Sequence, residues 1–277
     1  MPLTTTLSLE SNYQEPYEKQ KVIELKDVCL QYSINESPVL KNIGLSLYEN
    51  EFVCVLGPSG CGKSSLLNII AGFQKPTTGE VSINGVKYSK PTREIGVVFQ
   101  KHNLFPWMKI KDNVSFGLKM QGVAKKQRES LAEYYINLVQ LESVGDLLPH
   151  QLSGGMQQRA SIARTLAANP KVILMDEPFS ALDAITKETM QQHLISLWQK
   201  TKKTIFFITH DVNEALILGT RILVMQSNPG RVAIDMKNPL NQSNKIQIDF
   251  SSKQFQDLRT YLISTIKNNG KDDRNGY

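Results

Sequence analysis

One glycine-rich stretch, Gly57-Pro58-Ser59-Gly60-Cys61-Gly62-Lys63-Ser64, constrains the fold more than any other feature of this chain. It fits the pattern G-x-x-x-x-G-K-[ST] in full, between an apolar run at 52–56 that predicts a buried strand and an amphipathic stretch at 64–70 that predicts a helix. Glycines let successive backbone N–H groups and the start of the helix point at a nucleotide phosphate. The alternative is a chance glycine turn before a helix, and the full match in the right order argues against it.

The last residues of this stretch carry the polar side chains that a nucleotide needs. Lys63 would reach the β and γ oxygens, and the Ser64 hydroxyl would bind Mg²⁺, which prefers oxygen ligands. We include the neighbouring Ser65 in the predicted site.

Composition limits the number of domains and the classes of protein that the chain can belong to. A chain of 277 residues with 40% hydrophobic residues is long enough for one large domain with or without an appendage. The net charge of +6 is spread over short, separated basic groups, which argues against a nucleic-acid surface. Three cysteines without metal-ligand spacing predict neither a disulfide framework nor a zinc site, and they fit a reducing cytosol.

No run of apolar residues is long enough to cross a membrane, and the N-terminus lacks the pattern of a secretory signal. Any role at a membrane must therefore come through a partner. Residues 1–19 are polar and without periodicity, so we expect a flexible tail there.

Two antiparallel strands are predicted at 21–32 and 39–47, ahead of the buried strand. Tyr32 closes the first of them. Its ring could fill the strand surface or stack on a purine base, and the sequence leaves these two interpretations open. After the phosphate-binding helix, a strand at 80–83 is followed by a hairpin signal at Asn84-Gly85.

A helical block is predicted next, from about 101 to 170. A short strand at 95–99 precedes it, with Gln100 at the strand exit. Apolar residues recur with a helical period at 125–141, and a second strong helix is expected at 154–168, before Asn169-Pro170.

The second half of the chain alternates between strands and helices. A hydrophobic strand at 172–177 ends in Asp176 and Glu177, the position at which an α/β sheet places ligand-binding groups. His210 follows a strand at 204–209. We expect the remaining elements to be a helix at 184–200, a helix from His210 to Gly219, a strand pair at 221–226 and 231–236, and a final amphipathic helix at 253–267.

These motifs, with Leu152-Ser153-Gly154-Gly155-Met156-Gln157-Gln158-Arg159 between the two phosphate motifs and Ser180-Ala181-Leu182-Asp183 after them, closely resemble the ATPase subunit of ABC transporters. The resemblance implies an α/β P-loop NTPase fold with an antiparallel β subdomain and an inserted helical subdomain. It assigns 20–236 to the ATPase domain and leaves 237–277 as a C-terminal extension.

The resemblance also implies roles for single residues. Ser153, Gly154 and Gly155 would form an anion-binding helix start that meets the γ-phosphate bound by a second copy of the chain, so that two chains sandwich two ATP molecules. Asp183 would link the two sites of that dimer.

The acids and the residues beside them would carry the hydrolysis. Asp176 would hold Mg²⁺, and Glu177 would act as the base that orients the attacking water. Gln100 would touch both Mg²⁺ and that water, and His210 would sense the γ-phosphate.

Two shorter segments, 102–107 and 227–231, resemble the nitrate, sulfonate, taurine and bicarbonate branch of bacterial importers, whereas 237–240 departs from that branch. The resemblance implies a peripheral subunit on the cytoplasmic face of the inner membrane. It would drive a separate permease, with an extracytoplasmic solute-binding protein, and carry a small oxyanion or organic sulfonate. A non-transport ABC ATPase acting on a cytosolic complex is the alternative, but such proteins carry two ATPase halves or a long coiled coil.

Two further hypotheses concern a short apolar segment and one cysteine. The apolar segment Leu104 to Trp107 would form part of a socket for a permease helix, unless Trp107 merely caps the core of the helical block. Cys61, beside Lys63 and a helix start, would favour the thiolate, so that alkylation would block ATP binding. The alternative is that Cys61 is only a small residue at a loop position that tolerates many side chains.

Overall fold

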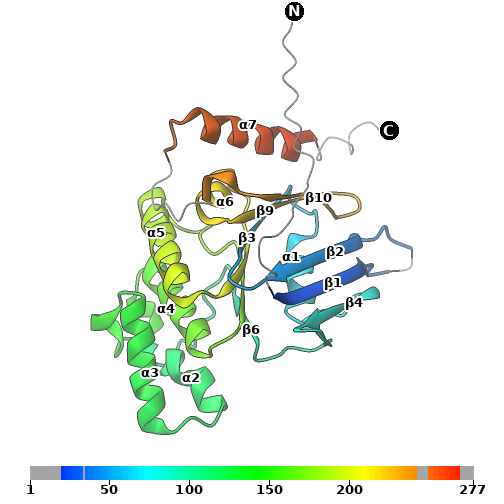
Figure 1. Ribbon diagram of the computed structural model, residues 1–277. Coiled ribbons are helices and arrows are strands. Elements are labelled where there is room, and N and C mark those ends of the chain that lie inside the picture. The colour runs from blue at the N-terminus through cyan, green and yellow to red at the C-terminus, as the bar shows by residue number, and fades with distance from the viewer. Residues whose placement is uncertain (1–19, 34, 242–248, 269–277) are drawn as a thin grey trace, which may run out of the picture.

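The computed structural model describes residues 20–33, 35–241 and 249–268. The expected tail at 1–19 lies outside the described residues. Figure 1 shows two sheets with a helix between them and a block of helices to one side.

The larger sheet has six strands in the order β10-β9-β3-β8-β7-β6. Each neighbouring pair is parallel, except that β10 pairs with β9 in the antiparallel sense. The bounds are β3 Phe52–Leu56, β6 Ile95–Val98, β7 Val172–Asp176, β8 Thr204–Ile208, β9 Arg221–Gln226 and β10 Arg231–Lys237. Every residue of β3 and β8 is buried, because parallel sheets are covered on both faces and their strands read as continuous apolar runs.

Alternate residues of the central strand β3 face two different cores. Val53 and Val55 pack with helix α1 (Lys63–Ile70) and the second sheet, whereas Phe52, Cys54 and Leu56 pack with the remaining helices. This alternation follows from the two-residue period of a strand. The phosphate-binding loop therefore starts at the end of a strand that is buried on both faces.

The second sheet is antiparallel and has the order β2-β1-β4-β5. Its strands are β1 Lys21–Leu30, β2 Leu40–Tyr48, β4 Thr78–Ile83 and β5 Val86–Lys87. Asn84 and Gly85 join the last two with φ values of 48° and 78°, as a tight hairpin turn requires. The expected antiparallel subdomain is thus confirmed, with β4 starting two residues before the predicted strand.

A helical block is inserted between β6 and β7. It contains α2 (Ile110–Met120), α3 (Lys125–Leu138) and α4 (Gly154–Ala167), which pack against one another. Helix α3 ends three residues before the predicted end because Gln140 has a left-handed backbone, with φ 58°, that turns the chain. Short 3₁₀ segments at Glu142–Val144 and Pro149–Gln151 lead into α4.

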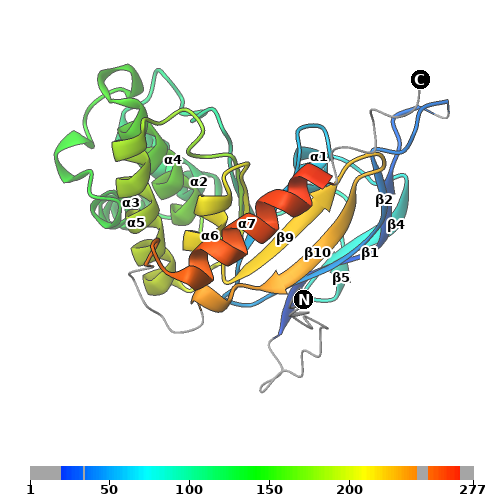
Figure 2. The ribbon, with the colours of Figure 1, turned by 90° about the horizontal axis from the view of Figure 1, so that it is seen from above.

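The chain closes with α5 (Ala184–Thr201), α6 (Val212–Leu218), a 3₁₀ segment at Pro239–Asn241 and α7 (Lys253–Asn268). Figure 2 shows α7 lying across α6 and β9. Phe255 and Leu262 are buried there, so the predicted amphipathic helix does present an apolar face to the core. In the part of the chain that the structure describes, no helix is long and apolar enough to cross a membrane.

Candidate active site

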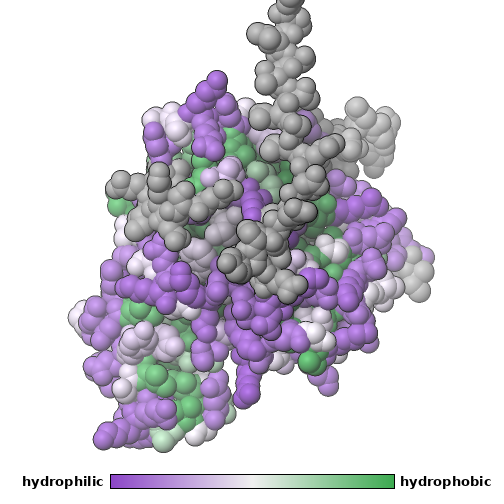
Figure 3. All heavy atoms as spheres, in the orientation of Figure 1, coloured by the Kyte–Doolittle hydropathy of each residue, from purple (hydrophilic) through white to green (hydrophobic). Residues whose placement is uncertain are grey.

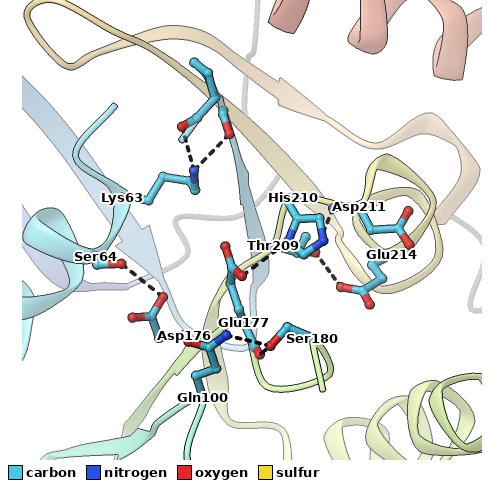
Figure 4. A network of polar contacts seen from close by, with 12 residues as sticks. Lys63, Ser64, Gln100, Asp176, Glu177, Ser180, Thr209, His210, Asp211 and Glu214 are labelled. Carbon is cyan, nitrogen blue, oxygen red and sulfur yellow. Dashed lines mark hydrogen bonds and ion pairs between the residues drawn. The ribbon is translucent and has the colours of Figure 1, made fainter. Parts of the chain in front are cut away.

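Four adjacent parallel strands deliver the predicted site residues to one edge of the sheet. The phosphate-binding loop follows β3, Thr209 and His210 follow β8, Asp176 and Glu177 end β7, and Gln100 lies just beyond β6. Parallel strands bring their carboxyl ends to the same edge, and Figure 4 shows these side chains facing one another there.

The loop curls around the ammonium group of Lys63. Nζ of Lys63 donates to the carbonyl oxygens of Gly57 at 2.8 Å and Pro58 at 2.9 Å. Gly62 precedes α1 with φ 94°, and a Cβ there would lie 2.6 Å from the Leu40 side chain, so only glycine fits. Ser59, Gly60 and Ser64 lie on the exposed side of the curl.

Tyr32 lies over the first turn of α1 rather than in the core. The residue is 61% exposed, and its hydroxyl lies 3.5 Å from Oγ of Ser65 and 3.3 Å from Oε1 of Gln74. An exposed ring beside the phosphate-binding helix does not fill the strand surface. Its position fits the stacking interpretation instead.

Ser64 and Asp176 form an oxygen-rich pair between α1 and β7. The Ser64 hydroxyl donates to Oδ1 of Asp176 at 3.3 Å. Burial raises the pKa of Asp176, and the charge of Glu177 raises it further, although the hydrogen bond from Ser64 opposes the shift. A cation at this position would relieve the concentrated negative charge.

These donors suit Mg²⁺, which takes oxygen ligands and is usually held by one or two carboxylates together with substrate phosphates. Among the described residues, no group of three or more His, Cys, Asp or Glu side chains could hold a metal. The pair formed by Ser64 and Asp176 offers one hydroxyl and one carboxylate of the kind that such an ion takes.

Glu177 and His210 meet across the β7 and β8 ends. Nδ1 of His210 lies 3.2 Å from Oε2 of Glu177. The backbone of Glu177 is left-handed, with φ 44°, and its N–H donates to the Ile208 carbonyl at 3.0 Å. Left-handed backbone is uncommon outside glycine, so this hydrogen bond fixes an unusual turn that aims the carboxylate at the site.

Gln100 reaches the same turn through Ser180. Nε2 of Gln100 donates to Oγ of Ser180 at 3.0 Å, and that hydroxyl donates to the Glu177 carbonyl at 2.9 Å. The sequence indicates Ser180 only as part of a motif and gives it no role. Its spacing of three residues from Glu177, which allows a hydroxyl to bond back to the turn, was the available signal.

Ser153 and Asp183 are helix caps that do not join the phosphate-binding loop of their own chain. Ser153 accepts from the Met156 N–H at 3.4 Å at the start of α4, and Asp183 accepts from the Thr186 N–H at 3.0 Å at the start of α5. The backbone hydrogen bond from Thr186 lowers the pKa of Asp183.

The two capped helix starts lie close together. A Cβ added to Gly155 would lie 2.7 Å from Cγ2 of Thr186, whereas one added to Gly154 would meet nothing within 4 Å. The start of α4 is therefore packed on the α5 side and open at Gly154.

The structure contradicts the reactive thiolate expected at Cys61. The residue is 1% exposed, and burial raises the pKa of its thiol despite the opposing charge of Lys63.

We therefore predict that iodoacetamide at neutral pH labels the half-buried Cys29 first and leaves Cys61 protected until the chain is unfolded. Mass spectrometry of native and denatured samples measures this order, and rapid native labelling of Cys61 would contradict it.

Comparison with known proteins identifies the architecture. The sequence model of the family described as ABC transporter matches residues 40–180. The chain belongs to the ABC transporter family. A dimeric ATP-binding cassette in a post-hydrolysis state, bound to ADP and Pi, superimposes with a TM-score of 0.69 at 38% identity, covering 78% of this chain and 98% of that one.

The matches to curated relatives cover most of the chain. A nitrate import ATP-binding protein of Synechocystis is 46% identical over 232 residues, covering 81% of this chain and 87% of its own length. A taurine import ATP-binding protein of Pseudomonas putida is 45% identical over 232 residues, covering 84% and 85%. An uncharacterized ABC transporter ATP-binding protein of Methanocaldococcus jannaschii is 44% identical over 253 residues, covering 90% and 94%.

These matches confirm the predicted fold class and the predicted family. The chain is an ATP-binding subunit of the ABC type, an ATPase coupled to transport.

Proposed function

We propose that this ATPase drives the import of a small oxyanion or organic sulfonate through a separate permease. The observation that carries the proposal is the convergence of Lys63, Asp176, Glu177, Gln100 and His210 on one sheet edge, in a chain similar to nitrate and taurine import subunits. Nitrate is an oxyanion and taurine is a sulfonate, so both relatives support the same class of cargo.

The proposed roles follow from the positions of the side chains. Lys63 binds the β and γ oxygens of ATP when its ammonium turns from the loop carbonyls to the phosphates. Glu177 orients a water molecule for attack on the γ-phosphate, and His210 holds the Glu177 carboxylate and contacts the same phosphate. Mg²⁺, bound by Ser64, Asp176 and Gln100, would neutralise the charge that develops on the phosphate oxygens. Tyr32 stacks on the adenine ring.

A second copy of the chain completes the site. The start of α4, with Ser153, Gly154 and Gly155, presents backbone N–H groups and the positive end of the helix dipole. Ser153 makes no hydrogen bond to its own phosphate-binding loop among the described contacts, which fits a γ-phosphate held by the partner. Asp183 lies beside this surface and would link the two sites. The similar solved cassettes are dimers.

The permease is proposed to dock on the loop that leads from β6 into α2. Trp107 is 74% exposed there, with its ring 5.7 Å from that of Phe105. Asn113 is buried, and its side-chain amide donates to the carbonyls of Phe105, Met108 and Lys109. These hydrogen bonds hold the loop backbone in place. The exposure of Trp107 disfavours the alternative that it caps the helical core. Figure 3 shows further apolar surface over the helical block.

We predict that Trp107→Ala lowers recovery of the complex with the permease and leaves ATP binding by the isolated chain unchanged, because exposed aromatic residues contribute disproportionately to interfaces. Tyr134→Ala, which removes another exposed aromatic side chain of the helical block, is the matched control. Affinity purification of the co-expressed complex measures recovery. Equal recovery of both variants would count against the docking surface.

The transported solute is tested with the assembled complex in membrane vesicles. Uptake driven by ATP should respond to taurine, another sulfonate or nitrate, whereas a response only to sugars or amino acids would contradict the proposed cargo. Localisation at the cytoplasmic face of the inner membrane should depend on the permease. Purification with ribosomes or DNA and without a membrane protein would favour the alternative, a non-transport ATPase.

A further inference from the structure

A partly buried polar cluster lies behind His210 and joins it to α5. The cluster consists of Lys187, Thr209, Asp211 and Glu214. Thr209 donates through Oγ1 to Oε2 of Glu214 at 2.5 Å, and Figure 4 shows this contact beside His210. Lys187 completes the cluster, with Nζ lying 2.8 Å from Oε1 of Glu214 and 3.0 Å from Oδ2 of Asp211.

The cluster fixes the residues on both sides of His210. Thr209 is 2% exposed, and its N–H donates to the Val55 carbonyl at 3.1 Å. The Asp211 N–H donates to Oγ1 of Thr209 at 3.0 Å, while Oδ1 of Asp211 accepts from the Asn213 N–H at 2.8 Å. With both neighbours held, the His210 ring has a defined direction, and that direction is toward Glu177.

Lys187 connects the cluster to Asp183 at the start of α5. It lies four residues after Asp183, in the first turns of the same helix. The Glu214 side chain is 4% exposed, so its charge needs this partner. Burial opposes the charged form of Lys187, but the two carboxylates outweigh it and raise the pKa of the ammonium group. The Lys187 ammonium group therefore stays charged at neutral pH.

Stability alone is a weak reason for such a cluster. Desolvation offsets most of the attraction in a buried ion pair, so apolar residues of similar volume often stabilise a fold as well or better. What a charged cluster with defined geometry does provide is one preferred arrangement of the segments that it joins.

We propose that Lys187 is a positioning residue that holds the His210 loop in register with the start of α5, so that Asp183 and His210 move together. This inference rests on the roles proposed above for Glu177 and His210. Closure of the dimer around ATP at Asp183 would then be transmitted through one helical turn to the side chain that faces the γ-phosphate.

The test begins with Lys187→Met, which keeps the aliphatic stem and removes the charge. We expect kcat per folded chain to fall roughly 10- to 100-fold, because a misplacement of about 1 Å in a catalytic constellation costs up to about 10²-fold. KM for ATP should stay within about twofold, since ground-state binding is untouched. Lys187→Arg should recover most of the rate. Lys171→Met, which removes an ion pair to Glu94 at the opposite end of β7, should leave kcat unchanged.

A double-mutant cycle separates positioning from general destabilisation. If Lys187 acts through His210, then adding Lys187→Met to His210→Ala should cause little further loss of kcat. The proposal would be overturned if the double variant lost kcat by the product of the two single fold-losses. A parental kcat in Lys187→Met would overturn it as well. If Lys187→Met does not fold, Glu214→Gln tests the same link by the same cycle.

The controls also separate this inference from the proposed function. A His210→Ala variant that hydrolyses ATP at the parental rate would remove the basis of both. A slow His210→Ala beside a fast Lys187→Met would remove only the role of Lys187.

Discussion

Glu177→Gln is expected to lower ATP turnover by roughly 10² to 10⁴, because a positioned general base typically contributes that much and the amide cannot accept the proton. The substitution keeps the shape of the side chain and its place beside His210. Affinity for ATP should stay near the parental value, since Lys63 and the loop bind the phosphates in the proposed site. Steady-state hydrolysis and equilibrium nucleotide binding measure the two quantities separately.

The same variant should trap the closed dimer. In the proposed dimer each γ-phosphate bridges Lys63 of one chain and Ser153 of the other, and this bridge should last longer when ATP is bound and not hydrolysed. Size-exclusion chromatography of Glu177→Gln should therefore show an ATP-dependent shift from monomer to dimer. The exposed Glu188 on α5 offers a matched control, and Glu188→Gln should hydrolyse ATP normally. Parental turnover in Glu177→Gln would show that another group is the base.

The sheet edge could be predicted from sequence because its signals are local. A glycine-rich loop after a continuous apolar run, and two acids at the end of another run, require only that parallel strands end at the same side. The sequence pattern does not predict α2 as a separate helix within the helical block. It has few buried apolar residues, it contains Gly117, which weakens a helix, and it buries the polar Asn113.

Burial and long-range contacts explain why the sequence does not predict the state of Cys61 or the ion pair of Lys187. The sequence shows the positive charge of Lys63 beside Cys61, which favours the thiolate. It does not show the burial of the side chain, which is the largest effect on the pKa of the thiol and raises it. Lys187 and Glu214 are 27 residues apart and each is typical of a solvated helix face. Only the packing of α5 against α6 brings them together as an ion pair behind His210.

Ser153→Arg, introduced into Glu177→Gln, is expected to abolish the ATP-dependent dimer. Ser153 caps α4 next to Gly154, where the helix start is open and must receive the partner's γ-phosphate in the proposed assembly. An arginine side chain would occupy the space that the phosphate needs, and removing the cap costs about 1 kcal/mol of helix stability. Nucleotide binding to the chain's own loop should persist, because Lys63 and Ser64 lie elsewhere.

The control places the same side chain at another helix start. Ala124→Arg adds equal bulk and charge at the exposed N-cap of α3, and it should leave the dimer of Glu177→Gln intact. Light scattering with and without ATP measures the mass of each variant. A dimer that survives Ser153→Arg would mean that the start of α4 does not contact the partner's nucleotide, because a phosphate contact at Ser153 leaves no room for a guanidinium stem.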